Sequence, residues 1–132
     1  MTPTKQTKLH QADGHHPGNC WQAVLASMLD LPLWMVPDFS EMFGRTSDHY
    51  MSRTDEWLNR LFNLHIVRVE EHPVEKLPEF YIVCGLSKRR VQHAVIYSQG
   101  KLVHDPHYSD CGIISVERCY YFEPTHKVHV QD

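Results

Sequence analysis

The sequence lacks the features that mark several broad classes of protein. No apolar run approaches the roughly 20 residues that a helix needs to cross a bilayer. The first residues carry no apolar segment after their charge, as a signal peptide would. Positive charge is not in excess, because the formal net charge is −3, and this argues against nucleic-acid binding driven by bulk charge. We therefore expect a cytoplasmic protein that binds neither membrane nor nucleic acid.

Several chemical motifs are missing as well. The chain has no glycine-rich phosphate loop, no paired-carboxylate motif and no internal repeat. Its four cysteines show no C-x-x-C spacing, which is simplest to explain by free, reduced thiols. A zinc site could be imagined from Cys20 and the histidines His10, His15, His16 and His49, but these show no H-x-x-x-H arrangement. We expect no bound metal and no cofactor.

What the sequence does contain is enough apolar material for a folded core. Hydrophobic residues make up 42% and aromatic residues 11% of its 132 residues, so we expect one globular domain over residues 1–132. Helical periodicity comes first and short β-branched or aromatic runs follow, which predicts an α+β fold with a mostly antiparallel sheet. Helices are predicted over residues 20–30 and 54–63, with Thr54 as a possible cap and a short helical turn within 31–39. Strands are predicted over residues 66–69, 80–84, 92–97, 101–104, 113–116 and 119–122.

The first predicted helix begins with a cysteine. Its large apolar residues fall at the i, i+3, i+4, i+7 and i+8 positions of an amphipathic helix (Trp21, Val24, Leu25, Met28 and Leu29). Asn19 precedes Cys20 and is a good candidate for the N-cap. A thiol at a helix start has a lowered pKa and is more often in its nucleophilic thiolate form. The alternative is a buried structural cysteine, which is the commoner role of a lone Cys.

A predicted hairpin carries the second chemical signal. If Ser98, Gln99 and Gly100 form a three-residue loop, His93 lies directly opposite Asp105 on the paired strand, with their Cβ atoms roughly 4.5–5.5 Å apart. A carboxylate there can hold one imidazole nitrogen so that the other is free for proton transfer. A two-residue loop would instead put the two side chains on opposite faces. The alternative interpretation is an exposed polar pair.

Three charged or basic groups lie near these candidates. His104 and His107 flank Asp105 and could compete with His93 as the base, although His104 should point to the opposite face from Asp105. Lys88, Arg89 and Arg90 immediately precede the His93 strand. This basic run is typical of a solvated loop, but in a cleft it could receive a carboxylate or phosphate on a substrate.

Cysteine on a helix, followed by histidine and acid on strands, resembles the papain-like cysteine peptidase superfamily. Within this superfamily, the sequence pattern is most similar to that of the compact bacterial peptidases that remove double-glycine leaders. It is also similar to their stand-alone relatives and to small uncharacterised bacterial and phage proteins. The resembling motifs are Gly18-Asn19-Cys20 with Ala23, Ala26, Ser27, Leu31-Pro32 and Val36-Pro37, then His93-Ala94-Val95-Ile96-Tyr97 and His104-Asp105-Pro106-His107. The resemblance spans roughly residues 11–123.

This resemblance implies a papain-like fold, with the N-terminal helices packed on the sheet, and a Cys20–His93–Asp105 triad. The family also has a glutamine upstream of the cysteine that helps to form an oxyanion hole. Gln11 is the candidate here, nine residues upstream rather than the six usual for leader peptidases, and Asn19 is a weaker one.

The implied function is hydrolysis of an amide or isopeptide bond in a peptide or protein substrate. Acyl transfer or deamidation by the same triad, and a non-catalytic binding protein on the same fold, remain open, as does the oligomeric state.

Overall fold

The computed structural model describes residues 1–10, 18–44, 49–69 and 76–125. Its helical elements are α1 (Cys20–Leu29), a 3-10 turn η1 (Leu33–Met35), α2 (Phe39–Phe43) and α3 (His49–Phe62). The strands are β1 (Leu64–Val69), β2 (Tyr81–Leu86), β3 (Gln92–Ser98), β4 (Lys101–His104) and β5 (Ser115–Pro124). No helix in these ranges is long and apolar enough to cross a membrane.

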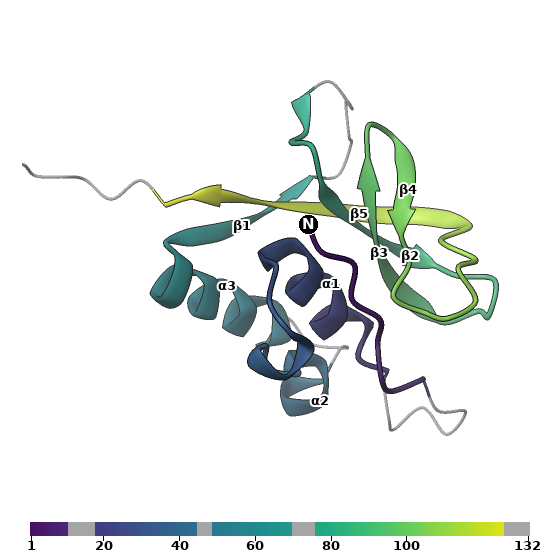
Figure 1. Ribbon diagram of the computed structural model, residues 1–132, viewed down its shortest axis with the longest axis horizontal. Coiled ribbons are helices and arrows are strands. Elements are labelled where there is room, and N and C mark those ends of the chain that lie inside the picture. The colour runs from purple at the N-terminus through teal and green to yellow at the C-terminus, as the bar shows by residue number, and fades with distance from the viewer. Residues whose placement is uncertain (11–17, 45–48, 70–75, 126–132) are drawn as a thin grey trace, which may run out of the picture.

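The five strands form one sheet in the order β1-β5-β2-β3-β4, and every neighbouring pair is antiparallel. Figure 1 shows the three α-helices together on one side of this sheet. Helix α1 packs against β3, and α3 packs against β1 and α2. The predicted α+β class, with helices on an antiparallel sheet, is confirmed.

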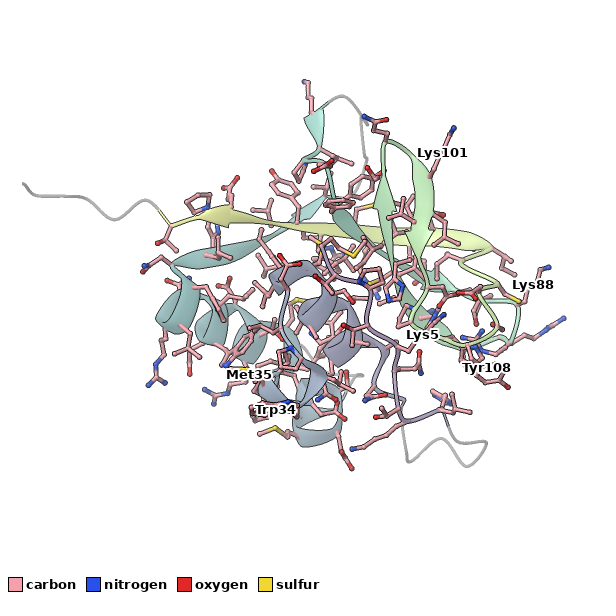
Figure 2. The ribbon with its side chains drawn as sticks, in the orientation of Figure 1. Lys5, Trp34, Met35, Lys88, Lys101 and Tyr108 are labelled. Atoms are coloured by element: carbon pink, nitrogen blue, oxygen red, sulfur yellow. The ribbon has the colours of Figure 1, made fainter. Side chains whose placement is uncertain are left out.

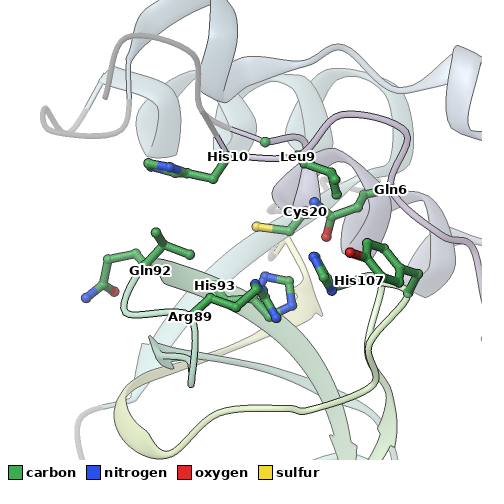
Figure 3. Close-up of a pocket in the computed structure, with 11 residues that line it drawn as sticks. Gln6, Leu9, His10, Cys20, Arg89, Gln92, His93 and His107 are labelled. Atoms are coloured by element: carbon green, nitrogen blue, oxygen red, sulfur yellow. The ribbon is translucent and has the colours of Figure 1, made fainter. Parts of the chain in front are cut away.

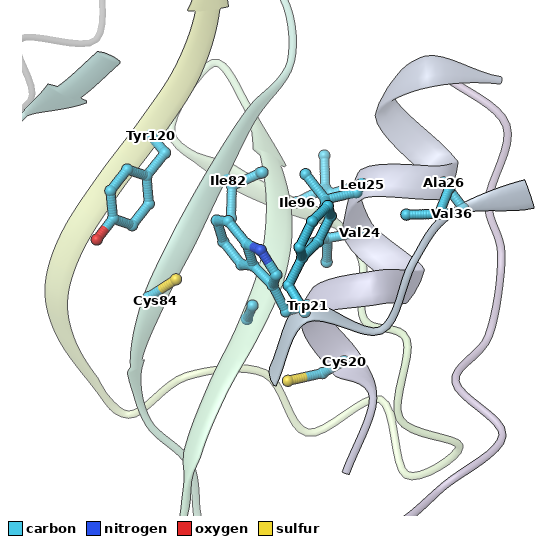
Figure 4. Close-up of a cluster of buried hydrophobic side chains, with 12 residues drawn as sticks. Cys20, Trp21, Val24, Leu25, Ala26, Val36, Ile82, Cys84, Ile96 and Tyr120 are labelled. Carbon is cyan, nitrogen blue, oxygen red and sulfur yellow. The ribbon is translucent and has the colours of Figure 1, made fainter. Parts of the chain in front are cut away.

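The core is divided between the two faces of the sheet because successive strand residues point to opposite sides. On the helix side, α1 packs its apolar residues against Ile82, Ile96 and Tyr120 (Figure 4). On the other side, Tyr81, Val83, Val95 and Cys119 form a second buried cluster. The alternation along β2, with Ile82 on one face and Tyr81 and Val83 on the other, links the two clusters.

Two predicted element boundaries are wrong. Helix α3 begins at His49, five residues before the expected start, so Thr54 lies inside the helix and does not cap it. Its buried hydroxyl instead accepts a hydrogen bond from Trp21 Nε1 (3.1 Å) and donates one to the Tyr50 carbonyl (2.6 Å). The two strands expected over residues 113–116 and 119–122 are a single long strand, β5, from Ser115 to Pro124.

The N-terminal segment runs as an irregular strap between α1 and the loop after β4 (Figure 1). The backbone N–H of Thr2 donates to the Ser27 carbonyl of α1 (3.0 Å), and the N–H of Gln6 donates to the Pro106 carbonyl (2.9 Å). His104 Nε2 donates to the Thr4 carbonyl (2.7 Å). The strap therefore joins the helix that carries Cys20 to the loop that carries Asp105.

Candidate active site

Cys20 is the first residue of α1, as predicted. Asn19 occupies the N-cap position, but its side chain makes no capping hydrogen bond, so its predicted capping role is wrong. Its Oδ1 accepts hydrogen bonds from the backbone N–H groups of Thr7 (2.9 Å) and Lys8 (2.7 Å). Asn19 thus fixes the N-terminal strap beside the cysteine, and it leaves the first N–H groups of α1 without a side-chain cap.

Gly18 explains how the strap can come so close to the helix start. A Cβ atom at this position would lie only 2.8 Å from the Lys8 carbonyl oxygen and 3.0 Å from Gln6 Nε2. Only glycine leaves room for this approach without a shift of the backbone. The Gly18-Asn19-Cys20 motif therefore packs the strap and presents the thiol at the same time.

The hairpin brings His93 and Asp105 together, although not through the predicted register. Ser98 pairs with Lys101, so the loop has two residues, Gln99 and Gly100, both with positive φ (52° and 78°). A β-bulge between Ile96 and Tyr97 then shifts the pairing by one residue. The two deviations add up to a shift of two residues, which restores the side-chain alternation and returns Asp105 to the face of the hairpin that carries His93.

His93 and Asp105 form a buried, hydrogen-bonded pair. The Nε2–H of His93 donates to Asp105 Oδ1 at 2.6 Å, and the two side chains are 2% and 0% exposed. The carboxylate also accepts backbone N–H groups from His107 at Oδ1 and from Gly112 at Oδ2, both at 2.8 Å. Asp105 is therefore fixed from three directions, and it orients the His93 ring so that Nδ1 is left for Cys20.

The imidazole of His93 and the carboxylate of Asp105 each stabilise the charged form of the other. Burial alone would lower the pKa of His93, but hydrogen bonds to Asp105 and Cys20, with the attraction of both groups, raise it to about 9. Burial likewise acts to raise the pKa of Asp105, but the hydrogen bonds from His93, His107 and Gly112 lower it to about 2. At neutral pH the pair is an imidazolium and a carboxylate. Because electrostatic attraction is mutual, the imidazolium favours the thiolate of Cys20.

Cys20 and His93 line a pocket of about 340 Å³ (Figure 3). It is enclosed by the N-terminal strap, the start of α1, the β2–β3 turn and the loop after β4. Its remaining lining residues are Gln6, Leu9, His10, Gly18, Arg89, Val91, Gln92, His107 and Tyr108. The thiol therefore faces a volume large enough to hold an extended acyl group or a short peptide segment.

His107 also lines the pocket. Its Nδ1 accepts hydrogen bonds from the backbone N–H (3.0 Å) and the hydroxyl (2.8 Å) of Ser109. Its pKa is lowered by burial and by the nearby charges of Arg89 and His93. Nδ1 of this neutral ring already accepts two hydrogen bonds, so His107 is a poor acceptor for the proton of a thiol. Nδ1 of His93, in contrast, is left for Cys20. His104 is bonded to Thr4, so it does not compete as the base.

The predicted oxyanion residue Gln11 lies outside the described residues and stays a prediction. The structure instead brings Gln6 to the pocket, where its Nε2 donates to the Lys8 carbonyl (2.8 Å). Its Oε1 is buried and has no hydrogen-bond partner among the described residues. Nothing in the local sequence singles out Gln6, because the Gly18–Asn19 contact that holds the strap joins residues far apart in the chain.

A metal centre has no support in the described part of the chain, where no group of three or more His, Cys, Asp or Glu side chains is placed to hold an ion. Of the histidines considered for zinc, His15 and His16 lie outside the described residues, and His10 lines the pocket. None of the four cysteines is in a disulfide.

Comparisons with protein-family models, with curated proteins and with solved structures give no match. Function must therefore be inferred from the chemistry of the site. A thiol at a helix start, a raised-pKa histidine and a buried orienting carboxylate form the set of groups that nucleophilic acyl chemistry requires.

Proposed function

We propose that this protein is a cysteine hydrolase with a papain-like arrangement of helices and sheet, cleaving an amide or isopeptide bond through Cys20, His93 and Asp105. The observation that carries the proposal is the buried His93–Asp105 hydrogen bond beside a thiol that lines a pocket. A structural cysteine has no need of such partners, and burying a charged pair is costly unless it is well satisfied.

The reaction follows from the protonation states. The thiolate of Cys20 attacks the acyl carbon, and the imidazolium of His93 protonates the leaving amine as the C–N bond breaks. A water molecule then attacks the resulting thioester and gives up a proton to neutral His93. The acid product leaves, and the thiolate and imidazolium are restored. Asp105 keeps the ring oriented and its charge compensated through both steps.

The negative oxygen of the tetrahedral intermediate needs hydrogen-bond donors. The uncapped first turn of α1 offers backbone N–H groups next to Cys20. The amide of Gln6 is one side-chain donor that lines the pocket, and its Nε2 has a second hydrogen beyond the one given to the Lys8 carbonyl. Gln11 is the alternative donor, and the two glutamines are separable by substitution.

An acyl-enzyme test requires no knowledge of the natural substrate. Incubation with p-nitrophenyl acetate should acetylate Cys20 rapidly, as seen by intact and peptide mass spectrometry, and nitrophenolate release should continue beyond one equivalent. Cys20→Ser should abolish the modification and His93→Asn should slow it by about 100-fold, since the base is lost. Cys119→Ala is the matched control, because it removes another buried thiol and should change nothing in the reaction.

The same assay separates the alternatives. If an added primary amine removes the acetyl group from Cys20 faster than water does and forms an acetamide, the protein is an acyltransferase. Acetylation spread evenly over the four cysteines, with no effect of His93→Asn, would leave a non-catalytic binding protein as the better interpretation and would contradict the hydrolase proposal.

A further inference from the structure

The charge of the pocket differs from that of the chain as a whole. The chain carries a net charge of −3, yet among the described residues no Asp or Glu lines the pocket. The lining includes the guanidinium of Arg89 and three histidines, His10, His93 and His107, of which His93 is an imidazolium at neutral pH. A pocket of this kind favours a negatively charged ligand.

We infer that the pocket selects acyl substrates that carry an oxyanion group, a carboxylate or a phosphate, close to the scissile bond, and that Arg89 binds this group. This inference rests on the proposed function, because it assigns the substrate class of the same site. It gives Arg89 a role in specificity, whereas the chemistry remains with Cys20 and His93.

The β2–β3 turn holds Arg89 in place. The backbone N–H of Arg90 donates to the Ser87 carbonyl (2.9 Å), and both the N–H and the hydroxyl of Ser87 donate to the Val91 carbonyl (3.1 and 3.0 Å). At the other end of the side chain, Arg89 Nη1 donates to Ser109 Oγ (3.2 Å). Arg89 is therefore held through the backbone of the turn at one end and through the bond of its guanidinium to Ser109 at the other, where it lines the pocket.

Arg89 carries more hydrogen-bond donors than its contact with Ser109 uses. A guanidinium carries five N–H groups, and one of them goes to Ser109. No carboxylate among the described residues forms an ion pair with it. Since a guanidinium matches the two oxygens of a carboxylate or phosphate, a substrate anion is the partner that this side chain fits.

The neighbouring cations are not equivalent to Arg89. Lys5 Nζ is already bound by Asp110 (2.7 Å) and by the carbonyls of Asp105 and His107. Lys88 is exposed, is absent from the pocket lining, and projects outward from the turn in Figure 2. Lys88 therefore provides a control of equal charge, one residue away.

The test uses alkylating probes that differ only in charge. N-iodoacetylglycinamide is neutral, N-iodoacetylglycine carries a carboxylate, and N-iodoacetylaminomethylphosphonate carries a phosphonate in place of a phosphate. In each reaction the Cys20 thiolate displaces iodide and forms a C–S bond. Rates at Cys20 are measured by quenched peptide mass spectrometry, and the ratio of anionic to neutral probe is compared between variants.

The ratio should fall by about 3- to 10-fold in Arg89→Gln and stay within about 2-fold of wild type in Lys88→Gln, as expected for one partly screened charge near the thiol. Arg89→Lys should keep part of the ratio. A larger effect on the carboxylate probe than on the phosphonate would assign the substrate anion as a carboxylate, and the reverse would assign it as a phosphate.

The two proposals fail in different ways. If Cys20 reacts with the neutral probe no faster than glutathione, the proposed function is overturned and the inference falls with it. If Cys20 reacts rapidly but Arg89→Gln and Lys88→Gln change the ratio equally, the hydrolase stands and the assigned substrate class is overturned.

Discussion

Two buried thiols, one on each side of the sheet, show how the surroundings decide what a cysteine does. Cys20 is 2% exposed and Cys119 is 0% exposed. Cys119 lies on β5 in the apolar cluster with Tyr81, Val83 and Val95, and burial raises its pKa to about 11. Cys20 is the first residue of α1, and the imidazolium of His93 lies beside its thiol. Burial alone raises the pKa of a thiol, whereas a neighbouring cation lowers it and favours the thiolate.

The difference extends to the structure around each thiol. On the Cys119 face the contacts are apolar and tolerate small changes in volume. On the Cys20 side a chain of polar contacts links α1, the N-terminal strap, the hairpin and the loop after β4. Changes to the polar region should therefore alter both chemistry and folding, and changes to the apolar region only folding.

The largest effect is expected when His93, the partner that distinguishes Cys20 from Cys119, is replaced. In His93→Asn the thiol keeps its burial and its helix but has no imidazolium, so near pH 6 its thiolate fraction falls toward that of an ordinary thiol. The rate of alkylation by iodoacetamide at Cys20 should drop by about 100-fold. Cys111, which is exposed, serves as the internal reference; an unchanged rate ratio between the two would contradict the account.

The next effect concerns the support of the histidine. Asp105→Asn keeps the shape but offers one acceptor oxygen in place of two, so one of the donors from His93, His107 and Gly112 is left unpaired. We expect a loss of about 2 kcal/mol in the free energy of unfolding by urea near pH 7. Asp110→Asn, at an exposed ion pair with Lys5, should cost under about 1 kcal/mol; equal costs would show that the buried carboxylate has no special role.

Lowering the pH should reduce the difference in stability between the wild type and Asp105→Asn. The pKa of Asp105 is depressed to about 2 from an ordinary value of 3.8, so its contribution to stability is present above about pH 4 and is lost as the pH falls through 2. The gap between wild type and Asp105→Asn should therefore narrow by about 1 to 2 kcal/mol between pH 5 and pH 2. Urea titrations at the two pH values measure it, and a constant gap would mean that folding does not lower the pKa of this carboxyl group.

The smallest effect is expected on the apolar side. Cys119→Ala removes one sulfur atom from a packed cluster and should lower stability by about 1 kcal/mol. It should leave the alkylation rate of Cys20 unchanged within error, because no polar contact joins the two regions through β5 among the described residues. A large change in that rate would show that the two faces are coupled.

Local patterns predicted much of this structure. Apolar spacing located α1 to within one residue of its end, and the β-branched runs located β1 to β4. Both patterns depend on neighbours in the chain, which is why they can be read without the fold. The start of α3 differs from the prediction because Thr54 resembles a cap, whereas the first turn, with Tyr50 and Met51, packs on the core.

The parts of the site that depend on distant residues were harder to predict. The contact between His93 and Asp105 was expected from a register that the structure does not have, because the bulge at Ile96/Tyr97 has no local signature and compensates for the shorter turn. Gln6 reaches the pocket through contacts with Gly18 and Asn19 that no spacing rule describes. The basic run Lys88, Arg89 and Arg90 predicts an anion site only if its loop lies in a cleft, and of the three residues Arg89 lines the pocket.

The most direct test of the central claim is a competition among the four native cysteines for a limiting amount of iodoacetamide near pH 6. Accessibility alone favours Cys111, the one exposed thiol of the four. If His93 and the start of α1 activate Cys20, the first label appears on Cys20 despite its 2% exposure, about 100-fold faster than on Cys111. Labelling of Cys111 first, with Cys20 as slow as Cys119, would contradict the account.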